Sequence, residues 1–190
     1  MRLIIGISGS SGVIYGIRLL QVLKDQEDVE THLVMSPTAK MNIPIETDMS
    51  FKEVEALADQ VHNFNDVAAN ISSGSFRTDG MIIAPCSMKT LSSIVHSFAD
   101  NLLARAADVV LKEGRKLVLM PRETPLHVGH CRLLYEAAQM GVQIAPPMPA
   151  FYNRPESIED IVNHSVGRVL DLFELDSGIV KRWVGTRPGK

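Results

Sequence analysis

Short apolar runs alternate with stretches of helical spacing along most of the chain. The apolar runs are typical of buried strands and cover residues 1–7, 30–35, 80–85, 116–120 and 141–144. Helices are predicted over residues 13–24, 49–59, 91–96, 101–113, 130–139 and 158–172, and a further helix start follows Ser36. This alternation predicts a parallel sheet that is covered on both faces by helices in right-handed crossovers.

The fold class expected from this pattern is α/β, with a flavodoxin-like doubly wound parallel sheet in a Rossmann-like three-layer arrangement. We assign residues 1–190 to a single domain and expect the tail, residues 175–190, at a subunit interface. Between residues 60 and 78 the pattern is weak and polar, which indicates an irregular excursion over a site. Sheets of this class bind ligands beyond the C-terminal ends of their strands.

Composition excludes several classes of partner. The net charge of −3 shows no basic footprint, so no nucleic acid is expected. No apolar run is long enough to span a membrane, and the N-terminus lacks a signal-peptide pattern. Cys86 and Cys131 are far apart without metal-ligand spacing, which favours a reducing, cytoplasmic location over a disulfide scaffold.

The turn after the first strand is the main candidate for ligand binding. Its sequence, Ser8-Gly9-Ser10-Ser11-Gly12, leads directly into a helix, so backbone N–H groups, hydroxyls and the positive end of the helix dipole could hold a phosphate. The glycine spacing is GxxGxxG and not the dinucleotide fingerprint GxGxxG. An equally open alternative is a tight turn in which Ser11 only caps the helix.

Hydroxyl and charged residues follow the other strands as well. Ser36 and the pair Ser87 and Thr90 open helices, while Arg122 and Glu123 follow the fourth strand. Turns of this kind that converge on one sheet edge favour a phosphorylated ligand, although ordinary helix caps use the same residues. No Asp-rich Mg²⁺ motif is present, so phosphate chemistry here would rely on Arg, Lys and Tyr.

Histidine and cysteine give weaker signals. His127 and His130 are three residues apart without the carboxylate of an HExxH motif, which favours a helix start over a metal site. Cys86 could be a nucleophile, but a small buried residue after a strand is the more common case.

Several motifs in this order resemble a UbiX-type flavin prenyltransferase, including the phenolic-acid-decarboxylase-associated homologues. The motifs are the Ser/Gly turn, Pro85-Cys86-Ser87 with Thr90-Leu91, Asn101-Leu102 with Arg105 to Val109, Pro121 to Pro125, Phe151-Tyr152 and Trp183. The resemblance covers nearly the whole chain. It implies a metal-independent enzyme that joins the dimethylallyl group of dimethylallyl monophosphate to reduced FMN. The product, prenylated FMN, would serve a UbiD-type decarboxylase, and the enzyme would be a homo-oligomer, commonly a dodecamer, with sites shared between subunits.

The resemblance also implies roles for individual residues. Those matching FMN-binding positions are Gly9, Ser10, Ser11, Ser36, Ser87, Met88, Lys89, Thr90 and Arg122. Those matching the grip on the prenyl phosphate are Arg105, Lys112, Arg122, Tyr152 and Arg168. Glu46, Glu123 and Ser11 match catalytic positions, and no metal ligand is implied. Ser10 departs from the alanine that is usual in the family, which leaves its backbone N–H as the matching group.

Two other functions remain open. One is an FMN-dependent decarboxylase of cysteine-containing peptides or pantothenoyl-cysteine, which would need a histidine base in the excursion, where only His62 is present. The other is a non-catalytic flavin-binding module, in which Lys112, Tyr152 and Arg168 would have no ligand.

Overall fold

A six-stranded, all-parallel sheet forms the centre of the chain's first 146 residues. The computed structural model describes residues 1–185, which fall into two compact units that divide after Pro146. The strands are β1 (Arg2–Ile7), β2 (Glu30–Met35), β3 (Gln60–His62), β4 (Gly80–Cys86), β5 (Lys116–Pro121) and β6 (Gln143–Ile144). Their order is β3-β2-β1-β4-β5-β6. The strand order reverses between β1 and β4, so the doubly wound α/β fold is confirmed.

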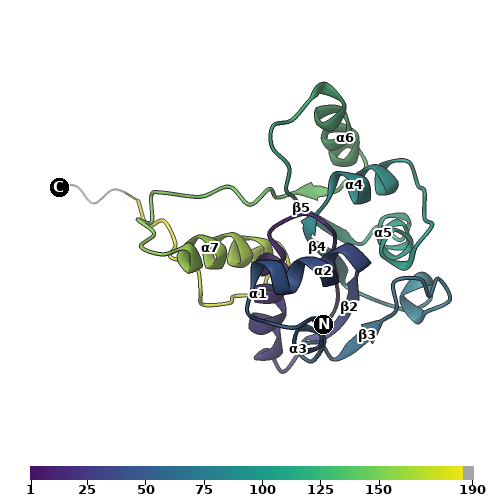
Figure 1. The fold of residues 1–190 in the computed structure, drawn as a ribbon, viewed down its shortest axis with the longest axis horizontal. Coiled ribbons are helices and arrows are strands. Elements are labelled where there is room, and N and C mark those ends of the chain that lie inside the picture. Colours follow the sequence, from purple (N-terminus) through teal and green to yellow (C-terminus); the bar gives the residue numbers. More distant parts are fainter. Residues whose placement is uncertain (186–190) are drawn as a thin grey trace. The chain divides into compact units, whose positions relative to one another are not determined.

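Helices of the first unit cover both faces of this sheet. They are α1 (Val13–Lys24), α2 (Pro37–Glu46), α3 (Phe51–Glu55), α4 (Met88–Val95), α5 (Leu102–Lys112) and α6 (Val128–Gln139). Figure 1 shows α4, α5 and α6 grouped beside β4 and β5. Alternate residues of β1 face opposite layers, since Gly6 lies against Leu103 of α5 and Ile7 lies against Gly16 of α1. The hydrophobic core therefore lies on both sides of the sheet, beneath the helices.

The largest differences from the sequence prediction concern β3 and the helix expected over residues 49–59. β3 was not expected, because its three residues include the exposed Gln60 and Val61 and therefore give no apolar run. The helix expected over residues 49–59 is only Phe51–Glu55, which begins at a capping box between Ser50 and Glu53. The following excursion is irregular, as predicted, with one 3₁₀ turn at Asn70–Ser72.

The second unit contains one helix and an extended tail. Helix α7 (Ile158–Asp171) begins at a capping box between Ser157 and Asp160. Its Asp171 carboxylate accepts hydrogen bonds from Arg168 at 2.6 Å and from Arg182 of the tail at 2.8 Å. Of the predicted interface tail, residues 186–190 lie outside the described residues. Among the described helices, none is long and apolar enough to cross a bilayer.

Candidate functional site

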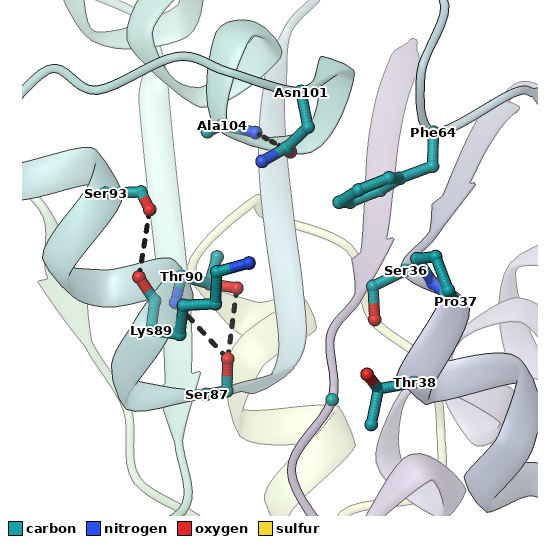
Figure 2. Close-up of a pocket in the computed structure, with 11 residues that line it drawn as sticks. Ser36, Pro37, Thr38, Phe64, Ser87, Lys89, Thr90, Ser93, Asn101 and Ala104 are labelled. Carbon is teal, nitrogen blue, oxygen red and sulfur yellow. Dashed lines mark hydrogen bonds between the residues drawn. The ribbon is translucent and has the colours of Figure 1, made fainter.

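A cavity of about 300 Å³ lies at the C-terminal ends of the strands in the first unit. One wall follows β2 and comprises Ser36, Pro37 and Thr38, and the opposite wall follows β4 and includes Ser87 and Lys89 (Figure 2). The remaining lining residues are Gly9, Phe64, Thr90, Ser93, Asn101 and Ala104. The cavity therefore occupies the edge of the sheet where the sequence predicted a ligand.

Three of the residues that line the cavity are also the N-caps of helices. Ser36 Oγ accepts a hydrogen bond from the Ala39 amide at 3.1 Å, and Ser87 Oγ accepts one from the Thr90 amide at 3.3 Å. Asn101 Oδ1 caps α5 in the same way, with the Ala104 amide at 3.0 Å. Ser36 and Ser87, each predicted either to cap a helix or to line a site, do both.

The chemistry of the lining suits an anion. Five lining residues carry hydroxyls, namely Ser36, Thr38, Ser87, Thr90 and Ser93. The Lys89 side chain extends into the space between the walls (Figure 2). None of the described lining residues is a carboxylate. Hydroxyls, one cation and the positive ends of two helices together favour a phosphate-bearing ligand.

The turn after β1 is used differently from the prediction. The amide groups of Gly12 and Val13 donate to Glu46 Oε2 at 2.8 and 3.1 Å, so a carboxylate of the protein itself occupies the α1 N-terminus. Ser11 does not cap the helix, because the N-cap is Gly12 at a φ of 100°. Ser8, a predicted donor to the ligand, is buried and instead bridges the carbonyl of Pro85 and the amide of Ser87.

Two other features of this turn favour a ligand. A Cβ at Gly9 would lie 2.7 Å from Thr38 Cβ, so only glycine allows the backbone to form this part of the wall. The Ser10 hydroxyl oxygen is buried and has no hydrogen-bond partner among the described residues. A buried hydroxyl without a partner is costly, and a bound ligand would supply one.

Of the predicted cofactor residues, five line the cavity: Gly9, Ser36, Ser87, Lys89 and Thr90. Met88 does not, because it packs against the hydrophobic core. Arg122 is exposed at the end of β5, and its amide donates to the Cys86 carbonyl at 3.2 Å.

The sequence analysis missed six lining residues: Pro37, Thr38, Phe64, Ser93, Asn101 and Ala104. Thr38 and Asn101 had a detectable signal, since each lies at a helix start: Thr38 is in the first turn of α2, and Asn101 is the N-cap of α5. Phe64 had none, because it lies in the excursion that has no regular pattern.

The predicted phosphate-gripping cations of the first unit lie away from the cavity wall. Arg105 Nε donates to the Ser72 carbonyl at 3.2 Å, and Nη1 pairs with Asp108 at 2.9 Å. Lys112 lies two helical turns beyond Ala104 and pairs with Glu113. Two further predicted phosphate-gripping residues, Tyr152 and Arg168, belong to the second unit.

The structure does not support Cys86 as a nucleophile, and it gives His127 a role other than metal binding. Burial raises the pKa of the Cys86 thiol to about 12, which removes its nucleophilic form at neutral pH. His127 caps α6, with Nδ1 accepting from the Gly129 amide at 3.0 Å, so the predicted helix start is confirmed. Among the described residues, no group of three or more His, Cys, Asp or Glu is arranged to hold a metal.

His62, the only histidine available as a base in the excursion, lies in a paired network. Its Nε2 is 2.8 Å from Nδ1 of the buried His32, and His32 Nε2 is 3.0 Å from Glu30 Oε1. His62 does not line the cavity described above. His62 is thus held by His32 and lies outside the cavity in which the cofactor is expected.

The histidine pair predicts that the protein becomes less stable in mild acid. Burial lowers the pKa of both His32 and His62 in the folded protein. Below the ordinary histidine pKa of about 6.5, the unfolded chain therefore binds more protons than the folded one, and stability falls as pH decreases. The expected result is a decreasing free energy of urea unfolding between about pH 7 and pH 5.

A His62→Gln variant is the comparison for this experiment. It removes one of the paired imidazoles, so its loss of stability over the same pH range should be smaller. Burial also lowers the pKa of His164, which accounts for part of the slope that remains. A wild-type stability that does not change over this range would contradict the prediction.

Comparisons with known proteins agree on one family. The Flavoprotein family model matches residues 1–170. A relative from Escherichia coli K12, named flavin prenyltransferase UbiX, is 61% identical over 186 residues, which cover 97% of this chain and 98% of that protein. The similarity to this relative therefore extends over nearly the whole of both chains.

Solved structures show the same similarity. The dodecameric FMN-dependent UbiX-like decarboxylase from Escherichia coli O157:H7 is 57% identical with a TM-score of 0.96, covering 97% of this chain and all of that one. AnUbiX (PadA1), in complex with FMN and dimethylallyl pyrophosphate, is 53% identical with a TM-score of 0.95 and covers 98% of each chain. The cavity described above thus belongs to a fold that binds FMN in a close relative.

Proposed function

Because this chain belongs to the UbiX flavin prenyltransferases of the Flavoprotein family, we propose that it joins the dimethylallyl group of dimethylallyl monophosphate to reduced FMN. The observation that best supports this function is the hydroxyl-lined cavity at the switch point of the sheet, in a chain that is similar over nearly its full length to a protein named for that activity. The enzyme is a transferase, and its product is prenylated FMN.

The residues of the cavity fit the flavin cofactor. Hydroxyls at the N-termini of α2 and α4 and the Lys89 ammonium suit the phosphate and ribityl oxygens of FMN. The Phe64 ring provides an apolar surface for the flavin ring. We assign Gly9, Ser36, Ser87 and Thr90 as contacts and the Ser10 hydroxyl as a further donor or acceptor.

We assign the prenyl phosphate to Arg105, Lys112, Arg122, Tyr152 and Arg168. Four of these groups are cations and the fifth is a hydroxyl, as the increasing charge on a leaving phosphate requires. Lys112 is about 12 Å along α5 from Ala104, at ~1.5 Å per residue, and is not among the residues that line the cavity. We therefore propose that a second copy completes each site, within a homo-oligomer that is a dodecamer.

The protein's part in the reaction is orientation, charge and proton transfer. When bound, reduced FMN supplies a nucleophilic ring nitrogen that receives the dimethylallyl group as phosphate leaves. Arg122 and Lys112 stabilise the negative charge on the departing phosphate oxygens. We assign proton transfer to Glu123, because Glu46 Oε2 already accepts two backbone amides and therefore serves to hold the turn that carries Ser11.

Glu123→Gln tests that assignment. Glu123 is exposed, and among the described residues its carboxylate accepts only the neighbouring Thr124 amide, at 3.0 Å, so the amide variant should fold and bind FMN normally. Loss of a general acid or base typically slows a reaction by about a hundredfold or more. The expected result is unchanged FMN affinity with slower formation of prenylated flavin in a single-turnover assay, and full activity would exclude Glu123 from the mechanism.

The decisive experiment for the function is anaerobic. The purified protein is mixed with FMN, a reductant and dimethylallyl monophosphate, and the extracted flavin is analysed by mass spectrometry. A flavin heavier by one five-carbon prenyl unit is expected. Unmodified flavin that stays tightly bound would instead favour a flavin-binding module. A parallel reaction with dimethylallyl pyrophosphate determines which phosphate the enzyme prefers.

We further propose a recipient and a location. Prenylated FMN made here would pass to a UbiD-type decarboxylase, a transfer that mixing the two proteins and following decarboxylation would test. The location would be the cytoplasm, where Cys86 and Cys131 remain free thiols as the structure has them.

A further inference from the structure

Tyr152 is held on two sides by other rings of the second unit. Its ring packs edge-on against His164 with centroids 5.5 Å apart and against Trp183 at 5.7 Å. The tyrosine is 50% exposed, whereas His164 is 8% exposed. A ring held by two neighbours has few orientations, and its exposed half remains accessible to a ligand.

Polar contacts link the Tyr152 hydroxyl to His164 and His164 to Asn153. The Asn153 amide nitrogen lies 3.5 Å from His164 Nδ1, and His164 Nε2 lies 3.4 Å from the Tyr152 hydroxyl. We assign the Asn153 amide nitrogen as the donor, which makes Nδ1 the acceptor and leaves the imidazole proton on Nε2; in this orientation Asn153 Oδ1 is buried without a partner among the described residues. His164 then donates to the tyrosine oxygen, and the tyrosine's own proton is left for another acceptor.

We infer that His164 is a positioning residue for prenyl transfer: it holds the Tyr152 hydroxyl so that this hydroxyl donates its proton to an oxygen of the prenyl phosphate. The inference rests on the proposed function, in which Tyr152 contacts that phosphate. Nothing in the sequence analysis assigned a role to His164 or Asn153.

The surroundings of His164 keep it in the form that this role needs. Burial is the main cause of the lowered pKa of His164; the neighbouring Arg168 charge acts in the same direction, and the Asp171 charge opposes it. A neutral imidazole has one donor and one acceptor, which matches one contact to Tyr152 and one to Asn153. The second unit thus provides the tyrosine with an oriented partner before substrate binds.

A pair of amide variants isolates the Nε2 donor. His164→Gln places an amide nitrogen near the position of Nε2, and His164→Asn is one methylene shorter and reaches only the Nδ1 position. We expect His164→Asn to lower kcat/KM for dimethylallyl monophosphate on the order of tenfold, and His164→Gln to restore most of it. FMN affinity should be unchanged in both variants.

A double-mutant cycle with Tyr152→Phe separates positioning from a general structural effect. In the Tyr152→Phe background the hydroxyl is absent, so His164→Asn should cause no further loss. Equal losses in the wild-type and Tyr152→Phe backgrounds would overturn the inference, as would a His164→Asn variant with full activity.

The outcomes distinguish this inference from the proposed function. If Tyr152→Phe lowers kcat/KM but both His164 variants are normal, the positioning role is wrong and the phosphate role of Tyr152 stands. If Tyr152→Phe is fully active, the assignment of Tyr152 in the proposed function is wrong, and the positioning role fails with it. Thermal unfolding shows whether each variant still folds. If His164→Asn does not fold, the same double-mutant cycle with His164→Gln tests the positioning role.

Discussion

Replacing Lys112 by methionine is expected to slow prenyl transfer by about a hundredfold, because removing one donor to a developing oxyanion costs on the order of 3 kcal/mol. Methionine keeps the length and apolar stem of the side chain and removes only its charge. FMN binding should not change, since Lys112 is absent from the lining of the cavity. Rapid-quench measurement of prenylated flavin, alongside flavin titration, checks both parts.

Two controls accompany the Lys112 variant. Lys52→Met removes an exposed lysine from α3, outside the proposed site, and should retain full activity. Glu113→Gln removes the present ion-pair partner of Lys112 and should also retain activity, because under the proposed function the phosphate would replace that carboxylate. A Lys112→Met enzyme with normal rates would remove Lys112 from the phosphate site.

Mixed assemblies test whether sites are shared between copies. A Gly9→Val chain has a blocked cavity, since even a Cβ at that position lies 2.7 Å from Thr38, but it keeps Lys112. A Lys112→Met chain has the reverse combination. If Lys112 acts in a neighbour's site, co-expressing the two inactive variants should restore part of the activity. No recovery in an assembly shown to contain both chains would mean that Lys112 serves only its own chain.

Gly16→Ala is expected to lower the free energy of unfolding by about 3 kcal/mol, at the upper end of the usual cost of overpacking. An added Cβ would lie 2.3 Å from the carbonyl oxygen of Ala84 and 2.8 Å from a side-chain carbon of Ile7. The first obstacle is backbone in the centre of the sheet, so that clash cannot be relieved without shifting β4 or α1. The gain in helix propensity, about 1 kcal/mol, does not offset this.

Urea and thermal unfolding measure that loss, with Ile14→Ala on the partly exposed side of α1 as the comparison. Ile14 is 36% exposed, so its truncation should cost much less. Since Ala84 lies just before the turn that carries Ser87, a shift of β4 should also weaken FMN binding. A Gly16→Ala protein with wild-type stability would show that α1 moves away from the sheet at no cost.

Local sequence accounts for most of the secondary structure. The predicted residues 13–24 and 30–35 are the observed α1 and β2, because apolar periodicity there matches the burial of each element. The same reasoning failed for β3, whose partly exposed residues pair with β2 through backbone hydrogen bonds and need no apolar side chains. Edge pairing of this kind depends on a neighbouring strand and leaves no local signal.

Some residues of the candidate site could likewise be predicted from the sequence, and others could not. Ser36, Ser87 and Thr90 could be predicted because each follows a strand, and the ends of parallel strands meet at one edge. Phe64 could not, since it reaches the cavity from the irregular excursion, where its carbonyl accepts from the Leu102 amide at 2.8 Å. Met88, predicted at the flavin, is partly buried and packs against the core cluster, so its contact with the flavin stays a prediction.

By itself the sequence determined the α/β class, the strand ends that carry hydroxyls and the family to which the chain belongs. These properties reside in periodicity and in short motifs, which neighbouring residues specify. Only the tertiary structure decided that Glu46 occupies the α1 N-terminus, that His32 and His62 pair, and that Asn153 and His164 stand behind Tyr152. Each of these contacts joins residues that are separated along the chain, so it exists only once the fold has brought them together.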